Sequence, residues 1–274
     1  MSDPDPIADV AAAAELADGV APLDEATLLA LRHDSAGVRR WVRDRAFALV
    51  VGTDLSLVVH PEARRNGQGR ALLEEVLAEV DRAGLRAWSH ADHPGAARLA
   101  TTHGFDRVRE LWVMRRSSAV PLGDIAVPEG VTVRGYRDDD KEQLLRVNAA
   151  AFADHPEQGG MDAANLAARM AEPWFDPDGL LVAEDRDGGI LGFHWTKQHS
   201  PDLGEVYVVA IAPEAQGRGL GGVLTLAGLH HLAGKGVAEV LLYVESDNRP
   251  AISVYRRLGF GHEARDTHVM YRRG

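Results

Sequence analysis

Four glycines fall within six residues in the second half of the chain: Gly217, Gly219, Gly221 and Gly222. The stretch before them, 205–211, is rich in β-branched residues, which predicts a buried strand that ends by Pro213. After them, apolar residues recur at helical spacing. The unpaired amides and the dipole at a helix N-terminus attract anions, and glycine lets the backbone approach them closely. The segment therefore predicts a turn that can bind phosphate.

This turn fits neither GxGxxG nor GxxxxGK[ST], the dinucleotide and Walker-type patterns. It resembles Gln/Arg-x-x-Gly-x-Gly/Ala, the pyrophosphate loop of the GCN5-related N-acetyltransferases (GNAT family). On this segment alone, an ordinary glycine-rich turn is the alternative. The resemblance implies acetyl-CoA as cosubstrate. The contacts it implies are the strand residues Val209, Ala210 and Ile211, the turn residues Gln216, Gly217, Arg218, Gly219, Leu220, Gly221 and Gly222, and the later residues Asn248, Arg249, Pro250, Ala251, Ile252 and Ser253.

The same turn occurs a second time, 152 residues earlier in the chain. The sequence Pro-Glu-Ala at 61–63 aligns with Pro-Glu-Ala at 213–215, and a Gly-Phe pair follows at 104–105 as it does at 259–260. A loop, a helix, a strand and a Gly-Phe ending in the same order predict an internal duplication. The prolines and glycines of 117–130 are typical of a linker. We therefore expect two domains, 1–124 and 125–274.

The order of predicted elements is that of a mixed α/β fold. In the second half we expect strands at 131–135, 180–184, 190–196, 205–211, 239–244 and 266–272, and helices at 138–152, 162–171, 220–234 and 249–257. This order suits a sheet of mixed direction that splays where the cosubstrate enters. The resemblance covers nearly all of both halves. It implies two tandem GNAT-type acyl-CoA N-acyltransferase domains, the first of them degenerate.

A narrower resemblance rests on four segments of the second half: 155–160, 192–197, 204–209 and 242–248. They are similar to tandem acetyltransferases of the same family that acetylate the cysteinyl amine of cysteinyl-glucosaminyl-inositol. The resemblance implies that this substrate is contacted by Glu25, Glu157, Lys197, Glu205 and Tyr243, with Glu25 reaching a site shared by both halves. Taken singly, Lys197 could be solvated, Tyr243 could face the core, and Glu25 could serve only the helix dipole.

Two residues of the second half are expected to move protons. An ammonium must lose a proton before its nitrogen can attack a thioester, so a base is needed near the acetyl group. Glu205 has no cationic neighbour in sequence, and a carboxylate in an apolar wall holds a proton tightly enough to serve as that base. The resemblance gives Glu205 this role and makes Tyr255 the acid that protonates the CoA thiolate. A solvated glutamate and a core tyrosine are the alternatives. Asn248 is expected to cap the helix that begins after it.

The first half lacks both proton-transfer groups. Thr53 stands where Glu205 would be, and Ala100 stands where Tyr255 would be. Ahead of Leu55 we expect one strand, at 42–52, where the second half has two. We therefore expect a degenerate copy that does not catalyse but can still bind acetyl-CoA. The contacts implied for it are Leu57, Val58, Val59, Arg65, Asn66, Gly67, Gln68, Gly69 and Arg70.

Composition limits the classes of function that remain. The formal net charge of −11 argues against a nucleic-acid partner, and no apolar run is long enough to span a membrane. The chain has no cysteine, which excludes disulfides and thiolate metal sites, and its twelve histidines show no spacing that predicts a metal site. We expect a monomeric, cytoplasmic enzyme. The alternatives are an acetyltransferase of another amine and a non-catalytic acyl-CoA-binding protein.

Overall fold

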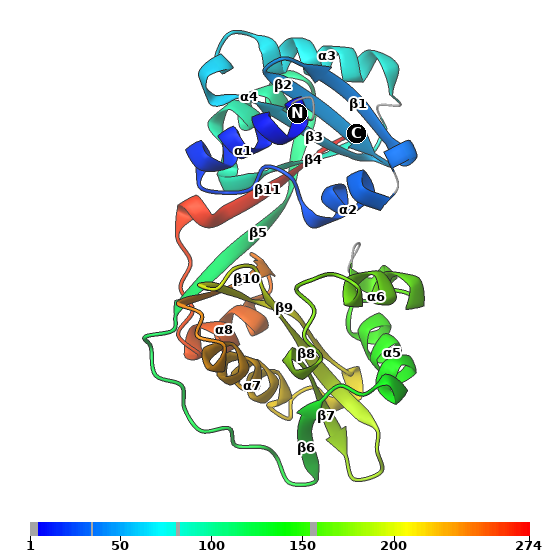
Figure 1. Cartoon of the computed structure of the whole chain (residues 1–274), viewed down its shortest axis with the longest axis vertical. Helices are drawn as coiled ribbons and strands as arrows, with labels where there is room; N and C mark the ends of the chain where they lie inside the picture. Colours follow the sequence, from blue (N-terminus) through cyan, green and yellow to red (C-terminus); the bar gives the residue numbers. More distant parts are fainter. Residues whose placement is uncertain (1–4, 34, 81–82, 154–157) are drawn as a thin grey trace. The chain divides into compact units, whose positions relative to one another are not determined.

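The computed structural model describes residues 5–33, 35–80, 83–153 and 158–274, which form two compact units (Figure 1). Unit 1 comprises Met1–Trp112 together with Glu263–Gly274, and unit 2 comprises Val113–His262. These units differ from the two sequence repeats, because the end of the chain belongs to unit 1. The boundary between repeats at 124/125 stays a prediction.

Unit 2 is built on a mixed sheet with the strand order β5-β10-β9-β8-β7-β6. Its strands are β6 (Val131–Gly135), β7 (Leu180–Asp185), β8 (Ile190–Gln198), β9 (Leu203–Ile211), β10 (Glu239–Glu245) and the end of β5 (Phe105–Ser117). Its helices are α5 (Lys141–Ala151), α6 (Ala163–Met170), α7 (Leu220–Gly234) and α8 (Arg249–Arg257). Each element predicted between 131 and 257 is present, with small shifts at its ends.

Strands β8 and β9 form the centre of unit 2. All residues of β8 from Ile190 to Lys197 are buried, because helices α7 and α5 both pack against these strands. The core cluster includes Phe193 and Trp195 of β8, together with Leu220 at the start of α7. This packing holds the end of β9 and the start of α7 in place, and the glycine turn lies between them.

The two edges of β9 are paired to different extents. It pairs in parallel with β10 from Leu203 to Val206, and the described residues show no pairing between these strands beyond that point. On its other edge β9 pairs antiparallel with β8. A bulge occurs there at Tyr207, because Trp195 pairs with Val208 and the next residue, Thr196, pairs with Val206. The pairing of β9 with β10 therefore ends partway along β9, as the predicted splay of the sheet requires.

Unit 1 has a sheet with the order β1-β2-β3-β4-β11-β5. Its further strands are β1 (Val38–Arg43), β2 (Ala46–Val51), β3 (Asp54–Val59), β4 (Arg86–Ser89) and β11 (Thr267–Arg273), and its helices are α1 (Pro6–Asp18), α2 (Glu25–His33), α3 (Gln68–Glu79) and α4 (Pro94–Thr102). The expectation of one strand ahead of Leu55 is wrong, since β1 and β2 form a hairpin there. The missed strand is largely exposed and carries Arg39, Arg40 and Arg43, as charged edge strands commonly do.

The last strand of the chain completes unit 1. β11 lies between β4 and β5 and pairs antiparallel with both. Val269, Met270 and Tyr271 of β11 are buried, and two of them, Val269 and Tyr271, belong to the core cluster that α3 covers. A strand that ends the second repeat in sequence is therefore part of the fold of the first unit.

Candidate active site

The predicted phosphate-binding turn of unit 2 lies between β9 and α7. A short 3-10 helix, Pro213–Ala215, follows β9, and Gly217 and Gly219 then adopt left-handed backbone angles, with φ of 78° and 79°. Glycine adopts this conformation without the strain that a Cβ would cause. Gly219 is the N-cap of α7 and has no side chain that could bond the first helical amides. The exposed turn therefore leaves the start of α7 open to an anion.

The side chains of the described residues leave space beside this turn. A Cβ atom added at Gly221 would have Cγ1 of Ile211 as its nearest neighbour, at 3.9 Å, and one added at Gly222 would lie 4.0 Å from Val254. The adjacent backbone of 209–211 has no partner in β10 among the described residues. Open amides beside an unpaired strand edge suit a pyrophosphate and the amide groups of a pantetheine arm. The predicted cosubstrate contacts therefore fit this geometry, and their roles stay predictions.

Glu205 lies on β9 with only 5% of its surface exposed. Its Oε2 is 2.6 Å from Nε2 of His199, and Lys197 of β8 is its registered partner across the hairpin. Glu205 has no cationic neighbour in sequence, but the β8–β9 hairpin brings a lysine and a histidine beside it, so the wall around it is not wholly apolar, contrary to expectation. The alternative of a solvated glutamate is excluded as well.

Lys197 is buried against aromatic rings rather than solvated. Its Nζ lies 4.6 Å from the ring centroid of Trp174 and 5.0 Å from that of Tyr207. These two rings are 5.1 Å apart in a T-shaped arrangement, and the guanidinium of Arg169 lies 5.5 Å from Tyr207. Rings at such distances stabilise a cation that has lost part of its hydration. Neither Trp174 nor Tyr207 was predicted from the sequence as a site residue.

Tyr255 and Asn248 both lie at α8. Burial raises the pKa of the Tyr255 hydroxyl to about 12, and the ring packs edge-on against Phe260 at 6.0 Å. The hydroxyl therefore carries its proton at neutral pH, as a general acid must. Asn248 is the N-cap of α8, and its Oδ1 accepts a hydrogen bond from the Ala251 amide at 3.1 Å. The predicted cap is thus confirmed.

The remaining predicted substrate contacts lie in different parts of the chain. Tyr243 of β10 is 43% exposed, so the alternative of a core residue is excluded. Glu25 opens α2 in unit 1, where Asp24 accepts a hydrogen bond from the Thr27 amide at 2.7 Å. Glu157 lies outside the described residues. The substrate contacts of Glu25 and Glu157 stay predictions.

The corresponding turn of unit 1 has the same backbone shape but different surroundings. Arg65 and Gly67 have φ of 68° and 82°, so an arginine takes the left-handed conformation that Gly217 takes in unit 2. Arg64, which precedes them, donates two hydrogen bonds of 2.7 and 2.6 Å to Asp18. This ion pair reduces the positive charge that the turn can offer to a phosphate.

Space is also more restricted in unit 1. A Cβ atom added at Gly69 would lie 3.3 Å from Leu99, whereas one added at the equivalent Gly221 would have its nearest neighbour at 3.9 Å. The side chain of Val58, a predicted cosubstrate contact, packs in the core. Thr53 lies in an exposed turn and Ala100 is buried in α4, and neither side chain is a proton-transfer group. These features support the prediction of a degenerate copy, and acetyl-CoA binding by this copy stays a prediction.

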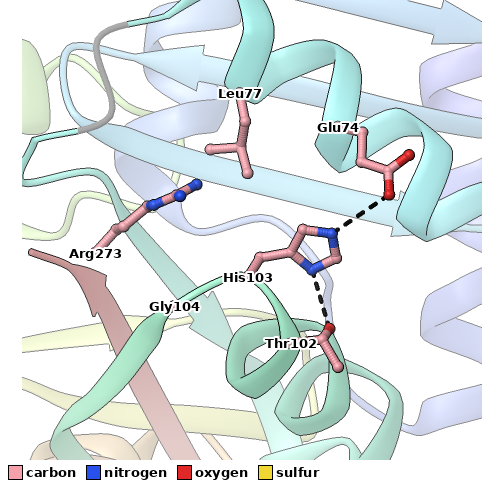
Figure 2. A pocket seen from close by; sticks show the side chains of 6 residues that line it. All are labelled: Glu74, Leu77, Thr102, His103, Gly104 and Arg273. Atoms are coloured by element: carbon pink, nitrogen blue, oxygen red, sulfur yellow. Dashed lines mark hydrogen bonds and ion pairs between the residues drawn. The ribbon is translucent and has the colours of Figure 1, made fainter.

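A pocket of about 460 Å³ lies elsewhere in unit 1 (Figure 2). None of the predicted site residues lines it; its lining residues are Glu74, Leu77, Thr102, His103, Gly104 and Arg273. Within the part of the chain that the structure describes, no group of three or more His, Asp or Glu residues could hold a metal ion. No described helix is both long enough and apolar enough to cross a membrane.

Comparison with known proteins agrees with this fold. A model of the acetyltransferase (GNAT) family matches residues 38–105 and 144–260. A tandem GNAT protein from the clavulanic acid biosynthesis pathway has a similar structure, with a TM-score of 0.73 and 21% identity, over 97% of this chain and 93% of that chain. The chain therefore belongs to the acetyltransferase (GNAT) family, and it is an acetyltransferase.

Its relatives within that family define a narrower group. A mycothiol acetyltransferase of Nocardioides sp. is 66% identical to this chain, over 97% of this chain and 96% of its own length. A mycothiol acetyltransferase of Thermomonospora curvata is 49% identical, over 99% of this chain and 94% of its own length. Both relatives are mycothiol acetyltransferases. The four segments of the second half resemble the same group, which is also called mycothiol synthase.

Proposed function

We propose that this chain transfers the acetyl group of acetyl-CoA to the cysteinyl amine of cysteinyl-glucosaminyl-inositol, which yields mycothiol and CoA. The observation that carries the proposal is the 66% identity to a mycothiol acetyltransferase over 97% of the chain. The buried Glu205, the protonated Tyr255 and the open glycine turn of unit 2 support the same reaction.

In this proposal the glycine turn and β9 hold the cosubstrate. The amides of 216–222 bind the pyrophosphate at the N-terminus of α7, where the helix dipole favours negative charge. The backbone of 209–211 binds the pantetheine arm, because β10 does not pair with it among the described residues. Residues 248–253, at the start of α8, complete the contacts.

Glu205 and Tyr255 carry out the proton transfers. Oε1 of Glu205 accepts no hydrogen bond from the described residues, so it can take a proton from the substrate ammonium. The neutral amine then attacks the thioester carbonyl, and the CoA sulfur leaves with a proton from Tyr255. The nitrogen loses its second proton as the amide forms, and this proton restores the Tyr255 hydroxyl. Lys197 and Tyr243 bind polar groups of the acceptor. The aromatic rings around Lys197 hold its ammonium in place without removing its charge.

The test is acetylation of cysteinyl-glucosaminyl-inositol, followed by mass spectrometry because the substrate has a thiol of its own. We expect the cysteinylated amine to gain one acetyl group and glucosaminyl-inositol to gain none. Turnover of a different amine alone would indicate another acetyltransferase. Acetyl-CoA binding without turnover of any amine would indicate a binding protein.

Glu205→Gln tests the proposed base. We expect kcat to fall about 10²- to 10⁴-fold, the usual contribution of a general base, because the glutamine amide cannot accept the ammonium proton. Calorimetry should show unchanged affinity for acetyl-CoA. The matched control is Glu142→Gln, which alters an exposed carboxylate on α5 of the same unit and should leave kcat unchanged. A wild-type kcat in Glu205→Gln would overturn the assignment.

A further inference from the structure

A carboxylate that acts as a base must be held in one orientation, and one side chain does this for Glu205. The glutamate side chain has several rotatable bonds, and its neighbours on β9, Gly204 and Val206, have no polar side-chain atoms. Among the described residues, only His199 forms a hydrogen bond with the Glu205 carboxylate. The functional importance of this contact rests on the proposed role of Glu205 as the base.

The contact is short, and the turn of the hairpin produces it. Oε2 of Glu205 lies 2.6 Å from Nε2 of His199. The His199 amide donates a hydrogen bond of 2.9 Å to the Leu203 carbonyl, and Gln198 pairs with Gly204, so the turn fixes the backbone on both sides. An ionised carboxylate can only accept hydrogen bonds, so Nε2 carries the hydrogen. One carboxylate oxygen is held, and Oε1 remains for the substrate.

Among the described residues, the other neighbours of Glu205 form no hydrogen bond with its carboxylate. The ammonium of Lys197, across the hairpin, lies over the rings of Trp174 and Tyr207, and β10 places the apolar Leu241 opposite Glu205. Asp202 lies in the same turn as His199, with its amide bonded to Ser200. The His199 side chain is 35% exposed and that of Glu205 only 7%. Solvent therefore reaches the histidine ring much more readily than the base.

We propose that His199 is a positioning residue, whose Nε2–H holds Oε2 of Glu205 and so directs Oε1 toward the acceptor amine. His199 does not touch the reacting atoms and acts through Glu205. Its removal leaves the carboxylate without a described partner and free to rotate. The loss should appear in kcat, because a misdirected base affects the transition state more than the binding of acetyl-CoA.

Two variants separate the hydrogen bond from the imidazole. His199→Leu removes the donor, and we expect kcat to fall about 10- to 100-fold with the KM for acetyl-CoA unchanged. His199→Gln keeps an N–H donor at similar reach, and it should recover most of kcat. A wild-type kcat in His199→Leu, or a His199→Gln variant no more active than His199→Leu, would overturn the proposal. Thermal melting establishes that both variants fold.

A double-mutant cycle tests whether His199 acts through Glu205. In the Glu205→Gln background, His199→Leu should cause no further loss of kcat. A second loss of equal size would show a role independent of Glu205 and would also overturn the proposal. Full activity of Glu205→Gln alone would instead overturn the proposed base, so the two failures can be told apart. Independently of activity, the His199 ring resonances in an NMR spectrum should shift in Glu205→Gln.

Discussion

Among single residues, Tyr255 shows how burial determines both chemistry and stability. Its pKa is raised from the ordinary value near 10 to about 12, because burial removes water from around the hydroxyl and disfavours the charged form. Below about pH 10 the hydroxyl is protonated in both the folded and the unfolded chain. Between about pH 10 and 12 the unfolded chain loses this proton first, so the free energy of unfolding decreases as the pH rises.

Tyr255→Phe should therefore change activity and stability in separate ways. We expect kcat to fall about 100-fold, with an unchanged pH profile below about pH 10, because wild-type Tyr255 does not ionise there. In urea unfolding, the variant should lose about 2 kcal/mol less than the wild type between about pH 10 and 12, since one pKa unit corresponds to about 1.4 kcal/mol. A wild-type kcat would rule out Tyr255 as the acid, and equal losses of stability would contradict its burial.

The backbone of the glycine turn was predictable from its motif, whereas contacts created by tertiary pairing were not. Gly217 and Gly219 belong to a recognisable loop, and the structure gives both the backbone angles that favour glycine. The contact between His199 and Glu205 and the position of Tyr207 arise only from the β8–β9 hairpin and its bulge. A tight hairpin predicted between these strands would have suggested that His199 lies near Glu205. The bulge at Tyr207 leaves no such signal, because it depends on how the two strands pack.

At the scale of elements, two glycines of unit 2 have the same backbone conformation and can be compared directly. Gly219 and Gly236 have φ of 79° and 82°, and a Cβ added at either would meet no atom within 4 Å. Gly219 precedes the first turn of α7, whereas Gly236 lies beyond the end of this helix. A side chain would therefore strain the backbone in the same way at both positions. Only Gly219 lies in the predicted pyrophosphate turn.

Alanine at each position separates strain from ligand binding. Both variants should lose about 1 kcal/mol of stability, because a Cβ disfavours the left-handed conformation. Only Gly219→Ala should weaken acetyl-CoA binding, about tenfold, which corresponds to about 1.4 kcal/mol. Calorimetric titration and urea unfolding of the two variants measure both effects. Equal affinities for acetyl-CoA would contradict the assignment of the turn.

Most elements were predictable because local signals define them. Apolar periodicity, together with flanking glycine and proline, placed the strands and helices between 131 and 257 close to their observed positions. β1 was missed because its arginines conceal an edge strand. The position of β11 between β4 and β5 was not predictable, since partners so distant in sequence are chosen by the whole core.

At the scale of the whole molecule, the two sequence repeats do not correspond to two separable pieces of chain. Deletion of 263–274 would remove β11, whose Val269 and Met270 are 0% and 2% exposed. We expect this deletion to unfold unit 1, with loss of hydrogen-exchange protection in β4 and β5. Removal of only the exposed Gly274 is the control and should change nothing. Retained protection in β4 of the shortened chain would show that β11 is dispensable.

The place of β11 also determines when the protein can finish folding during its synthesis. The strands of the first repeat leave the ribosome first, but β11, one of the two partners of β4, follows the whole of unit 2 in the sequence. Until then, β4 and β5 each present an unpaired edge, which can associate with other nascent chains. The repeat that is made first is thus completed only after unit 2 has been made, and a truncation between unit 2 and β11 endangers unit 1 rather than unit 2.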